Sequence, residues 1–196
     1  MENMATILHR VSLVIPVYRG ERTLLSLIDE IAPLAVERTS PAGHRFVVSE
    51  LLLVHDCGPY RSDRTIETLS QQHAFVRPVW LSRNYGQHAA TLAGMASATG
   101  DWVVTIDEDG QQDPADIGVM LDTAVAGALQ LVYARPTNPP PHGRLRNAMS
   151  RSAKAVTGKL LGNKDIGQFN SFRMVDGEIA RTLAAYCGNG IYLDMG

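Results

Sequence analysis

The sequence predicts an α/β fold in which a mainly parallel central sheet carries helices on both faces. Short and almost continuous apolar runs alternate along the chain with segments whose apolar residues recur at helical spacing. This alternation is typical of parallel strands joined by crossover helices. With 196 residues, 45% of them hydrophobic and 19% charged, the chain has the length and composition of a single domain.

The first elements are two strands, each followed by a helix. Residues 11–17 form an apolar run that Pro16 interrupts near its end, which predicts a buried strand. Apolar residues at helical spacing follow at 24–34, a second strand is expected at 46–54, and a helix at 64–73.

The next elements continue the alternation. A third strand is expected at 76–81, where Pro78 indicates an edge position because proline cannot donate to a neighbouring strand. A helix of small residues is expected at 86–98 and is ended by Gly100. The apolar run at 102–106 predicts the fourth strand.

The last elements expected are a helix at 114–126, which has proline at its start, and a fifth strand at 129–134. A proline-rich stretch at 136–141 cannot pair or coil regularly, and it divides the domain into two halves. These halves are residues 1–134 and 135–196.

Charge is segregated along the chain. The 18 Lys+Arg and 20 Asp+Glu give a net charge of -2, which argues against a nucleic-acid partner. Residues 84–134 nevertheless contain no Lys or Arg, whereas residues 135–173 contain one acid, Asp165. Arg outnumbers Lys by 15 to 3, and guanidinium groups bind phosphate bidentately. The basic segment therefore indicates binding to an anionic partner, either a phosphorylated acceptor or membrane head groups. The alternative is that these residues form a solvated helix face.

Several classes of protein are disfavoured by what the sequence lacks. No apolar run approaches the roughly 18 residues of a membrane-spanning helix, and no signal peptide is recognisable, so we expect a cytoplasmic chain. Cys57 and Cys187 form neither a disulfide framework nor a C-x-x-C pair. The glycine-rich motifs of dinucleotide oxidoreductases and P-loop NTPases and the G-x-S-x-G elbow of α/β-hydrolases are absent.

Acidic residues follow two of the expected strands. Asp107 and Asp109 lie two positions apart, so in extended backbone both carboxylates project to one side, and with Gln111 they suit Mg²⁺ or Mn²⁺. The alternative is an acidic turn that caps the next helix. Asp56 ends the second strand, where it could accept hydrogen bonds from a nucleotide or cap a turn.

Five motifs in order resemble family 2 glycosyltransferases, and within them the polyprenyl-phosphate group, which includes dolichyl-phosphate mannose synthases and undecaprenyl-phosphate sugar transferases. The motifs are V-I-P-V-Y at 14–18, L-V-H-D at 53–56, L-S-R-N-Y-G at 81–86, I-D-E-D-G-Q-Q-D-P at 106–114 and S-F-R at 171–173. The resemblance implies a GT-A fold and inverting transfer from a nucleotide sugar.

The resemblance also implies roles for individual residues. Asp107 and Asp109 would be catalytic, and Asp109 and Gln111 would ligate Mg²⁺ or Mn²⁺ on the donor diphosphate. Residues 1–134 would form the nucleotide-sugar-binding half and residues 135–196 the acceptor-side half. The implied nucleotide-binding residues are Pro16, Tyr18, Glu21, Asp56, Arg83, Asn84, Gly86 and Asp107. The implied acceptor-binding residues are Arg135, Arg144, Arg146, Ser171 and Arg173.

The function expected from these motifs is transfer of a sugar, UDP-linked in our expectation, to a polyprenyl phosphate at the cytoplasmic face of a membrane. No general base is identifiable, and a phosphate monoester, with a second pKa of about 6, needs none at pH 7. The alternatives are transfer to a saccharide or protein hydroxyl and a non-catalytic nucleotide-binding relative. Relatives continue into a membrane-associating segment that we expect to be absent after Gly196, so peripheral membrane contact stays open. The oligomeric state is not predicted.

Overall fold

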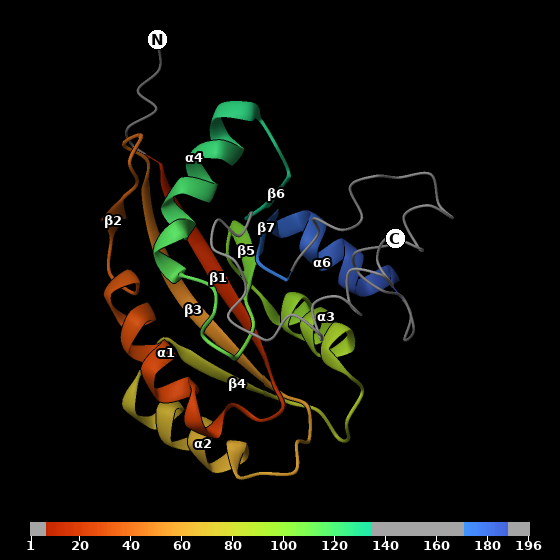
Figure 1. Cartoon of the computed structure of the whole chain (residues 1–196). Coiled ribbons are helices and arrows are strands. Elements are labelled where there is room, and N and C mark those ends of the chain that lie inside the picture. Colours follow the sequence, from red (N-terminus) through yellow and green to blue (C-terminus); the bar gives the residue numbers. More distant parts are fainter. Residues whose placement is uncertain (1–6, 135–170, 188–196) are drawn as a thin grey trace, which may run out of the picture.

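The computed structural model of the chain describes residues 7–134 and 171–187, which form one seven-stranded sheet covered by helices (Figure 1). The strand order is β2-β3-β1-β5-β7-β6, and β4 also pairs with β3. The strands are β1 (Leu8–Val17), β2 (Arg38–Thr39), β3 (Arg45–His55), β4 (Val76–Trp80), β5 (Trp102–Thr105), β6 (Leu131–Tyr133) and β7 (Arg173–Asp176).

The parallel part of the sheet confirms the first four strands expected from the sequence. Strands β1, β3, β4 and β5 run parallel, with β1 between β3 and β5. The central strand β1 is buried from Val11 to Val17, which explains its almost continuous apolar run. β4 pairs on one side only, with β3, so Pro78 stands in an edge strand as its missing N–H requires.

The antiparallel part of the sheet differs from the expectation. The fifth strand expected from the sequence is β6 of the structure, and it does not lie beside β5. Instead β7 pairs antiparallel with both β5 and β6, so a strand from the second half of the chain enters the sheet of the first half. The sequence did not indicate β7, which has only four residues and begins and ends on charged ones.

Helices cover both faces of the sheet, as expected. One face packs against α1 (Leu24–Ile31), α2 (Ser62–Gln72) and α4 (Ile117–Gly127), and the other against α3 (Gln87–Ser97) and α6 (Gly177–Tyr186). The expected helix at 114–126 divides into a short 3-10 turn, η4 (Pro114–Asp116), and α4. Two further 3-10 turns are η2 (Gly20–Arg22) and η3 (Ala32–Leu34). Among the described residues, none of the helices has the length and apolar character needed to cross a membrane.

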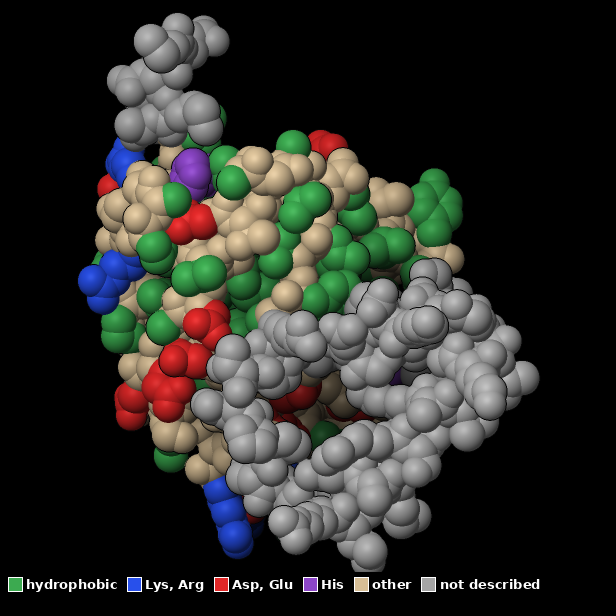
Figure 2. Space-filling view, turned by 45° about the horizontal axis from the view of Figure 1, so that its top comes forward, with side chains coloured by type: hydrophobic (Ala, Val, Ile, Leu, Met, Phe, Trp, Pro, Cys, Tyr) green, Lys and Arg blue, Asp and Glu red, His purple; other side chains and the backbone are tan. Residues whose placement is uncertain are grey.

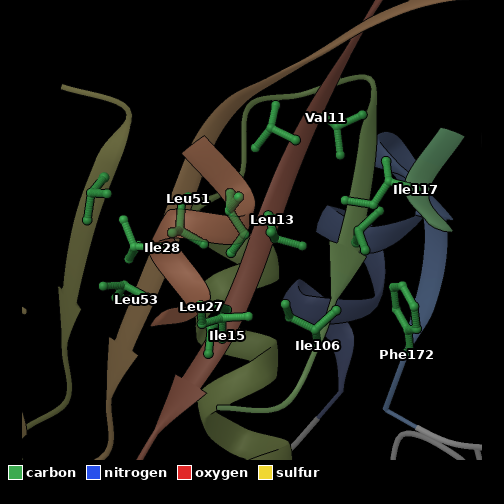
Figure 3. Packing of buried hydrophobic residues seen from close by; sticks show 14 of the residues in the cluster. Val11, Leu13, Ile15, Leu27, Ile28, Leu51, Leu53, Ile106, Ile117 and Phe172 are labelled. Atoms are coloured by element: carbon green, nitrogen blue, oxygen red, sulfur yellow. The ribbon is translucent and has the colours of Figure 1, made fainter. Parts of the chain in front are cut away.

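Two apolar cores hold these layers together, because alternate residues of a strand face opposite sides of the sheet. Leu13 and Ile15 of β1 pack with Leu27 and Ile28 of α1 in the larger core, which Figure 3 shows. Val14, the residue between them, packs into the smaller core beneath α3. The central strand is thus fixed from both sides, and its carboxyl end is a rigid base for the residues that follow.

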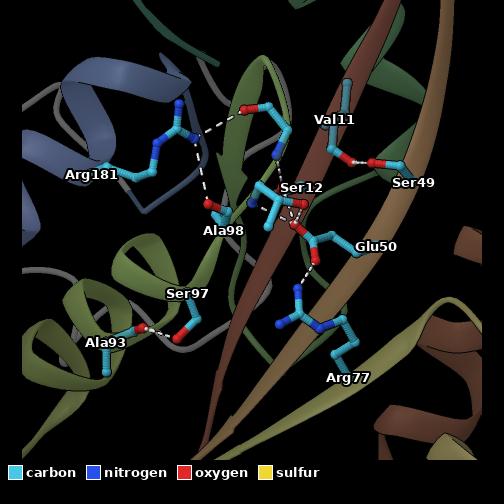
Figure 4. Close-up of polar contacts among 11 residues, drawn as sticks. Val11, Ser12, Ser49, Glu50, Arg77, Ala93, Ser97, Ala98 and Arg181 are labelled. Atoms are coloured by element: carbon cyan, nitrogen blue, oxygen red, sulfur yellow. Dashed lines mark hydrogen bonds and ion pairs between the residues drawn. The ribbon is translucent and has the colours of Figure 1, made fainter.

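A buried polar network ties the middle of β3 to the α3–β5 connection on the α3 face (Figure 4). The Glu50 carboxylate, 4% exposed, accepts hydrogen bonds from the Ser12 hydroxyl at 2.6 Å and from the Thr99 backbone N–H at 2.6 Å. It also pairs with the Arg77 guanidinium. Burial alone would raise the pKa of Glu50, but the hydrogen bonds from Ser12, Thr99 and Arg77 hold that pKa below its ordinary value.

We expect Glu50→Gln to destabilise the fold by about 1–3 kcal/mol at neutral pH, since it removes a buried, hydrogen-bonded charge. The folded-state pKa of Glu50 lies below the ordinary value of 4.5. The carboxylate therefore stabilises fully above that pH, and its contribution is lost as the pH falls through the folded-state pKa. Urea unfolding at several pH values should show the wild type and the variant converging in stability under acidic conditions.

Glu37→Gln is the matched control for this prediction, because Glu37 forms an exposed ion pair with Arg45. Exposed pairs contribute little to stability, so this variant should unfold almost like the wild type. Equal destabilisation by the two substitutions would contradict the role given to the buried network.

Candidate active site

A pocket of about 400 Å³ opens at the carboxyl ends of β1, β3 and β5. In open α/β sheets this edge is where ligands bind. The lining residues are Pro16, Val17, Tyr18, Asp56, Asn84, Gly86, Gln87, Asp107, Glu108 and Asp109. The structure therefore brings together six of the nucleotide-binding residues named from the sequence with both carboxylates of the D-x-D motif.

The Asp107 carboxylate accepts hydrogen bonds from three side chains around the pocket. Its Oδ1 accepts from Gln87 Nε2 at 2.5 Å, and its Oδ2 accepts from Gln112 Nε2 at 3.3 Å and from the Ser171 hydroxyl. Burial raises the pKa of Asp107 and the nearby Asp109 charge raises it further, while the Ser171 hydrogen bond acts in the opposite direction. These three donors fix the orientation of the carboxylate in the pocket wall.

Ser171 stands closer to the D-x-D motif than the sequence suggested. It was assigned to the acceptor loop, and its hydroxyl both donates to Asp107 and accepts from Gln112 Nε2 at 2.8 Å. Its carbonyl accepts from the Thr105 hydroxyl at the end of β5. The first described residue of the second half is therefore joined directly to the D-x-D motif.

Asp109 is the exposed carboxylate of the D-x-D motif and lines the pocket. From the described part of the chain its carboxylate accepts one hydrogen bond, from the Gln111 backbone N–H to Oδ1 at 3.0 Å. The described part of the chain contains no group of three or more His, Cys, Asp or Glu side chains placed to hold a metal. A cation here would therefore share its coordination between Asp109, the neighbouring Gln111 and oxygens from a ligand or water.

The charge of the pocket also fits a bound cation. Among the described lining residues four are acids, Asp56, Asp107, Glu108 and Asp109, and none is Lys or Arg. An anionic ligand would be repelled by this wall unless a divalent cation accompanied it. The hard carboxylate oxygens suit Mg²⁺ or Mn²⁺.

Glu108, which the sequence did not single out, clamps the end of β1 to the D-x-D segment. Its Oε2 accepts from the Tyr18 backbone N–H at 3.0 Å, and its Oε1 accepts from the Arg19 backbone N–H at 2.9 Å. A Cβ at Gly20 would lie 2.7 Å from the Glu108 carboxylate, so glycine permits this approach. Burial raises the pKa of Glu108, while the hydrogen bonds from Arg19 and Tyr18 oppose that rise.

We expect Glu108→Gln to weaken nucleotide binding by about tenfold, because an amide must turn its NH₂ group toward one of two backbone donors and leaves that donor unpaired. The Kd of an uncharged nucleoside, measured without metal, is the suitable measurement, since it reports the Tyr18 side of the pocket and carries no phosphate for the acidic wall to repel. Asp109→Asn is the comparison, and it should leave that Kd unchanged. A Glu108→Gln variant with the wild-type Kd would contradict the clamp.

Asp56 holds the segment that leads into α3. Its carboxylate, 3% exposed, accepts from the Tyr85 backbone N–H at 2.7 Å and from the Gly86 backbone N–H at 2.9 Å. Gly86 has φ of +88°, a left-handed conformation that glycine adopts without a steric penalty. Asp56 thus holds the backbone just before α3, and its nucleotide-binding role stays a prediction.

The residues after β3 press closely against the end of β1. A Cβ at Gly58 would lie 1.6 Å from the Tyr18 carbonyl oxygen, so only glycine fits there. Cys57 has φ of +47°, a strained conformation for a residue with a side chain, and its Sγ donates to the Leu81 carbonyl at 2.9 Å. The pocket wall at Tyr18 thus depends on a tight backbone contact between two loops.

Some residues named from the sequence are not brought into the pocket. Glu21 accepts a hydrogen bond from the Arg61 backbone N–H at 3.1 Å, and Arg83 lies over the Tyr85 ring. Arg173, in β7, is only 5% exposed. Arg135, Arg144 and Arg146 lie outside the described residues.

The acidic block of the sequence has two roles in the structure. Only the residues around the D-x-D motif line the pocket. Asp101 accepts from the Arg10 backbone N–H, Asp113 caps η4, and Asp122 accepts from the Ala42 backbone N–H. Figure 2 accordingly shows acidic side chains in several separate places on the visible face.

The sheet is mainly parallel, with the antiparallel strand β7 inserted between β5 and β6, and a D-x-D motif follows β5. This arrangement defines the GT-A class of glycosyltransferases. The GT-A fold expected from the resemblance is confirmed by solved structures. S. aureus TarS, which was also solved in complex with UDP-GlcNAc, has a TM-score of 0.64 and 14% sequence identity over 94% of this chain and 52% of its own. The chain belongs to glycosyl transferase family 2, whose model matches residues 12–183.

Two other solved structures share the fold. Glucosyl-3-phosphoglycerate synthase from Mycobacterium tuberculosis, solved with Mn²⁺ and UDP, has a TM-score of 0.56 and 20% identity over 87% of this chain and 58% of its own. The mannosyltransferase PcManGT from Pyrobaculum calidifontis, solved with GDP-Man and Mn²⁺, has a TM-score of 0.61 and 15% identity over 91% of this chain and 48% of its own.

Curated relatives confirm the resemblance to the polyprenyl-phosphate group. The undecaprenyl-phosphate 4-deoxy-4-formamido-L-arabinose transferase of Photorhabdus laumondii is 36% identical over 120 residues, 60% of this chain and 34% of the relative. The Pseudomonas aeruginosa protein of the same name is 37% identical over 118 residues, 60% of this chain and 33% of the relative. The match thus spans about a third of the length of these relatives.

Proposed function

We propose that the chain transfers a sugar, with inversion, from a UDP-linked donor to a polyprenyl phosphate at the cytoplasmic face of a membrane. The observation that carries the proposal is the pocket itself, where the D-x-D carboxylates face the nucleotide-binding residues expected from the sequence. The relatives named as undecaprenyl-phosphate sugar transferases support this choice of acceptor.

The donor nucleotide would lie along the ends of β1 and β3. Pro16 and Tyr18 line one side of the pocket from the end of β1, and Asp56, Asn84 and Gly86 line another from the segments after β3 and β4. The Glu108 clamp and the Asp56 hydrogen bonds hold these two sides in place before any ligand binds. A site fixed in advance loses less conformational entropy when the donor binds.

The diphosphate would lie toward the D-x-D motif. Asp109 and Gln111 would hold Mg²⁺ or Mn²⁺, which would supply the positive charge that offsets the diphosphate in this acidic pocket. Asp107, fixed by Gln87 and Ser171, would orient the donor from the same wall. The cation, held beside the diphosphate, would stabilise the negative charge that develops on the departing UDP.

The acceptor phosphate would attack the anomeric carbon from the side opposite to the leaving UDP. A new bond forms between a phosphate oxygen and that carbon as the bond from carbon to the diphosphate breaks. A monoester phosphate is largely ionised at pH 7, so no residue has to remove a proton. Ser171, bonded to Asp107, lies where the acceptor-side half meets the donor pocket. Peripheral attachment to the membrane would bring the acceptor to this point.

The proposal is tested by incubating the chain with a panel of UDP-sugars, Mn²⁺ and either undecaprenyl phosphate or soluble saccharides, followed by analysis of released UDP and of products. A glycolipid formed only with the lipid phosphate is the expected result. Product on a saccharide hydroxyl would favour the alternative acceptor. Tight UDP binding without turnover of any donor would favour a non-catalytic relative, and either of these outcomes would overturn the proposal.

A further inference from the structure

We propose that the surface formed by the loops after β1, β3 and β4 docks the chain on an anionic lipid membrane. We name this surface the aromatic–arginine rim, and it consists of Arg19, Tyr60, Arg61, Trp80, Arg83 and Tyr85. The three loops lie together at one end of the sheet (Figure 1). The inference rests on the proposed function, because an acceptor embedded in a membrane requires contact with the membrane surface.

Exposed aromatic side chains concentrate at this end of the molecule. The exposed aromatic residues of the described chain are Tyr18, Tyr60, Trp80, Tyr85 and Tyr186, and only Tyr186 lies elsewhere. Tyr60 is 54% exposed and Trp80 is 47% exposed. Tyr and Trp combine an apolar ring with a polar edge, which suits them to the boundary between lipid and water.

Arginine side chains lie among these rings. The Arg19 guanidinium lies 5.4 Å from the centre of the Tyr18 ring and 5.7 Å from that of Tyr60. The Arg83 guanidinium lies 4.8 Å from the centre of the Tyr85 ring. These stacked pairs join basic charge and aromatic surface in one layer.

The charge of the three loops complements anionic head groups. The exposed basic residues of segments 18–23, 56–64 and 80–86 are Arg19, Arg22, Arg61, Arg64 and Arg83. The acids of these segments that are not buried are Glu21 and Asp63, and Glu21 accepts a hydrogen bond from the Arg61 backbone. The balance is therefore positive, although the whole chain has a net charge of -2.

The three loops are braced against one another. Cys57 in the second loop donates to Leu81 in the third, and Asp56 binds the Tyr85 backbone N–H. Glu21 beside the first loop binds the Arg61 backbone N–H in the second. The rim is thus fixed in advance, so binding to a flat surface requires little ordering of the loops.

The rim borders the donor pocket, since Tyr18, Asn84 and Gly86 line the pocket and belong to the same loops. Docking through the rim places the pocket mouth at the level of the head groups, where the phosphate of a membrane lipid lies. Single-stranded nucleic acid also binds aromatic and arginine side chains, so the test below includes an oligonucleotide. The relatives named as undecaprenyl-phosphate sugar transferases favour a lipid surface.

The test is co-sedimentation of the 196-residue chain with vesicles of phosphatidylcholine alone or mixed with phosphatidylglycerol. We expect wild-type binding only to the anionic vesicles, weakening as salt is added. The Arg19→Gln/Arg61→Gln double variant should bind about 25-fold more weakly, at about fivefold for each arginine. The Tyr60→Ser/Trp80→Ser double variant should also lose vesicle binding. Because the two double variants change different residues, either one tests the proposal if the other fails to fold. Arg10→Gln and Tyr186→Ser are matched controls away from the rim.

The proposal is supported if both rim variants lose vesicle binding, the controls do not, and the Tyr60→Ser/Trp80→Ser variant keeps the wild-type UDP affinity in solution. The proposal would be overturned if the rim variants bound vesicles as tightly as the wild type. It would also be overturned if the wild type bound neutral and anionic vesicles equally well. Tighter rim-dependent binding to a single-stranded oligonucleotide would also overturn it. Sugar transfer is measured separately. If the wild type binds vesicles through the rim but transfers no sugar, only the proposed function is contradicted. If the wild type transfers sugar but the rim variants bind vesicles normally, only the proposed role of the rim is contradicted.

Discussion

Asp109→Asn should reduce sugar transfer by about 10²- to 10³-fold while leaving the fold intact. Asp109 is exposed at the pocket, and the one recorded hydrogen bond to its carboxylate, from the Gln111 backbone, can also be accepted by the amide oxygen of Asn. What is lost is the negative charge that would hold the divalent cation beside the donor diphosphate. The initial rate at saturating donor and the Mn²⁺-dependent gain in UDP affinity, read from thermal shift, are the two measurements.

Asp113→Asn is the matched control for this prediction. Asp113 belongs to the same acidic block and caps η4 through a hydrogen bond from the Ala115 N–H at 2.9 Å, outside the pocket. Asn is an equally good cap, so this variant should keep both the rate and the metal dependence. Wild-type transfer by Asp109→Asn would remove the basis for placing the cation at this residue.

Gly58→Ala should have the second large effect, on the fold and on donor binding together. A Cβ at this position would lie 1.6 Å from the Tyr18 carbonyl oxygen and 2.6 Å from the Tyr18 carbonyl carbon. Both are backbone atoms, so one loop must move, and we expect a loss of about 2–4 kcal/mol in the free energy of unfolding. The displaced Tyr18 wall should also weaken UDP binding by at least about tenfold.

Gly118→Ala is the control for the same chemical change. Gly118 lies near the start of α4, where a Cβ would meet Phe46 and Pro41 at 3.5 Å, an ordinary contact. Because Ala favours a helix over Gly, this variant should be unchanged or more stable by up to about 1 kcal/mol. Urea unfolding of the Gly58→Ala and Gly118→Ala variants measures the two effects. A Gly58→Ala variant as stable as the wild type would show that the two loops can separate without loss of stability.

The fold was predictable where the sequence signal was long and regular. Continuous apolar runs identified β1, β3 and β5, because a strand covered on both faces has little room for polar residues. β7 escaped detection because a four-residue strand with Arg173 and Asp176 at its ends has no such run. Its place between β5 and β6 depends on pairing between distant segments, which local patterns do not encode.

The candidate site was predictable for a related reason. The D-x-D motif and the residues at strand ends have recognisable spacing, and the pocket contains most of them. Gln87, Gln112 and Glu108 were missed because an amide or a third acid in an acidic run has no distinctive pattern until the fold shows its partners. The burial of Arg173 in β7 was also not predictable, since the sequence shows only a basic residue in a basic segment, and its acceptor role stays a prediction.

The pairing of β6 with β7 has a consequence for how the protein can diversify. The Ala134 N–H donates to the Phe172 carbonyl at 3.0 Å, and Tyr133 stands opposite Arg173. The segment 135–170 therefore leaves the sheet and returns to it at neighbouring points. The entropic cost of closing a connection between neighbouring points rises only slowly with the length of the connection. An exchange of segment 135–170 would therefore leave the ends of β6 and β7 in place, and with them the framework of the donor pocket.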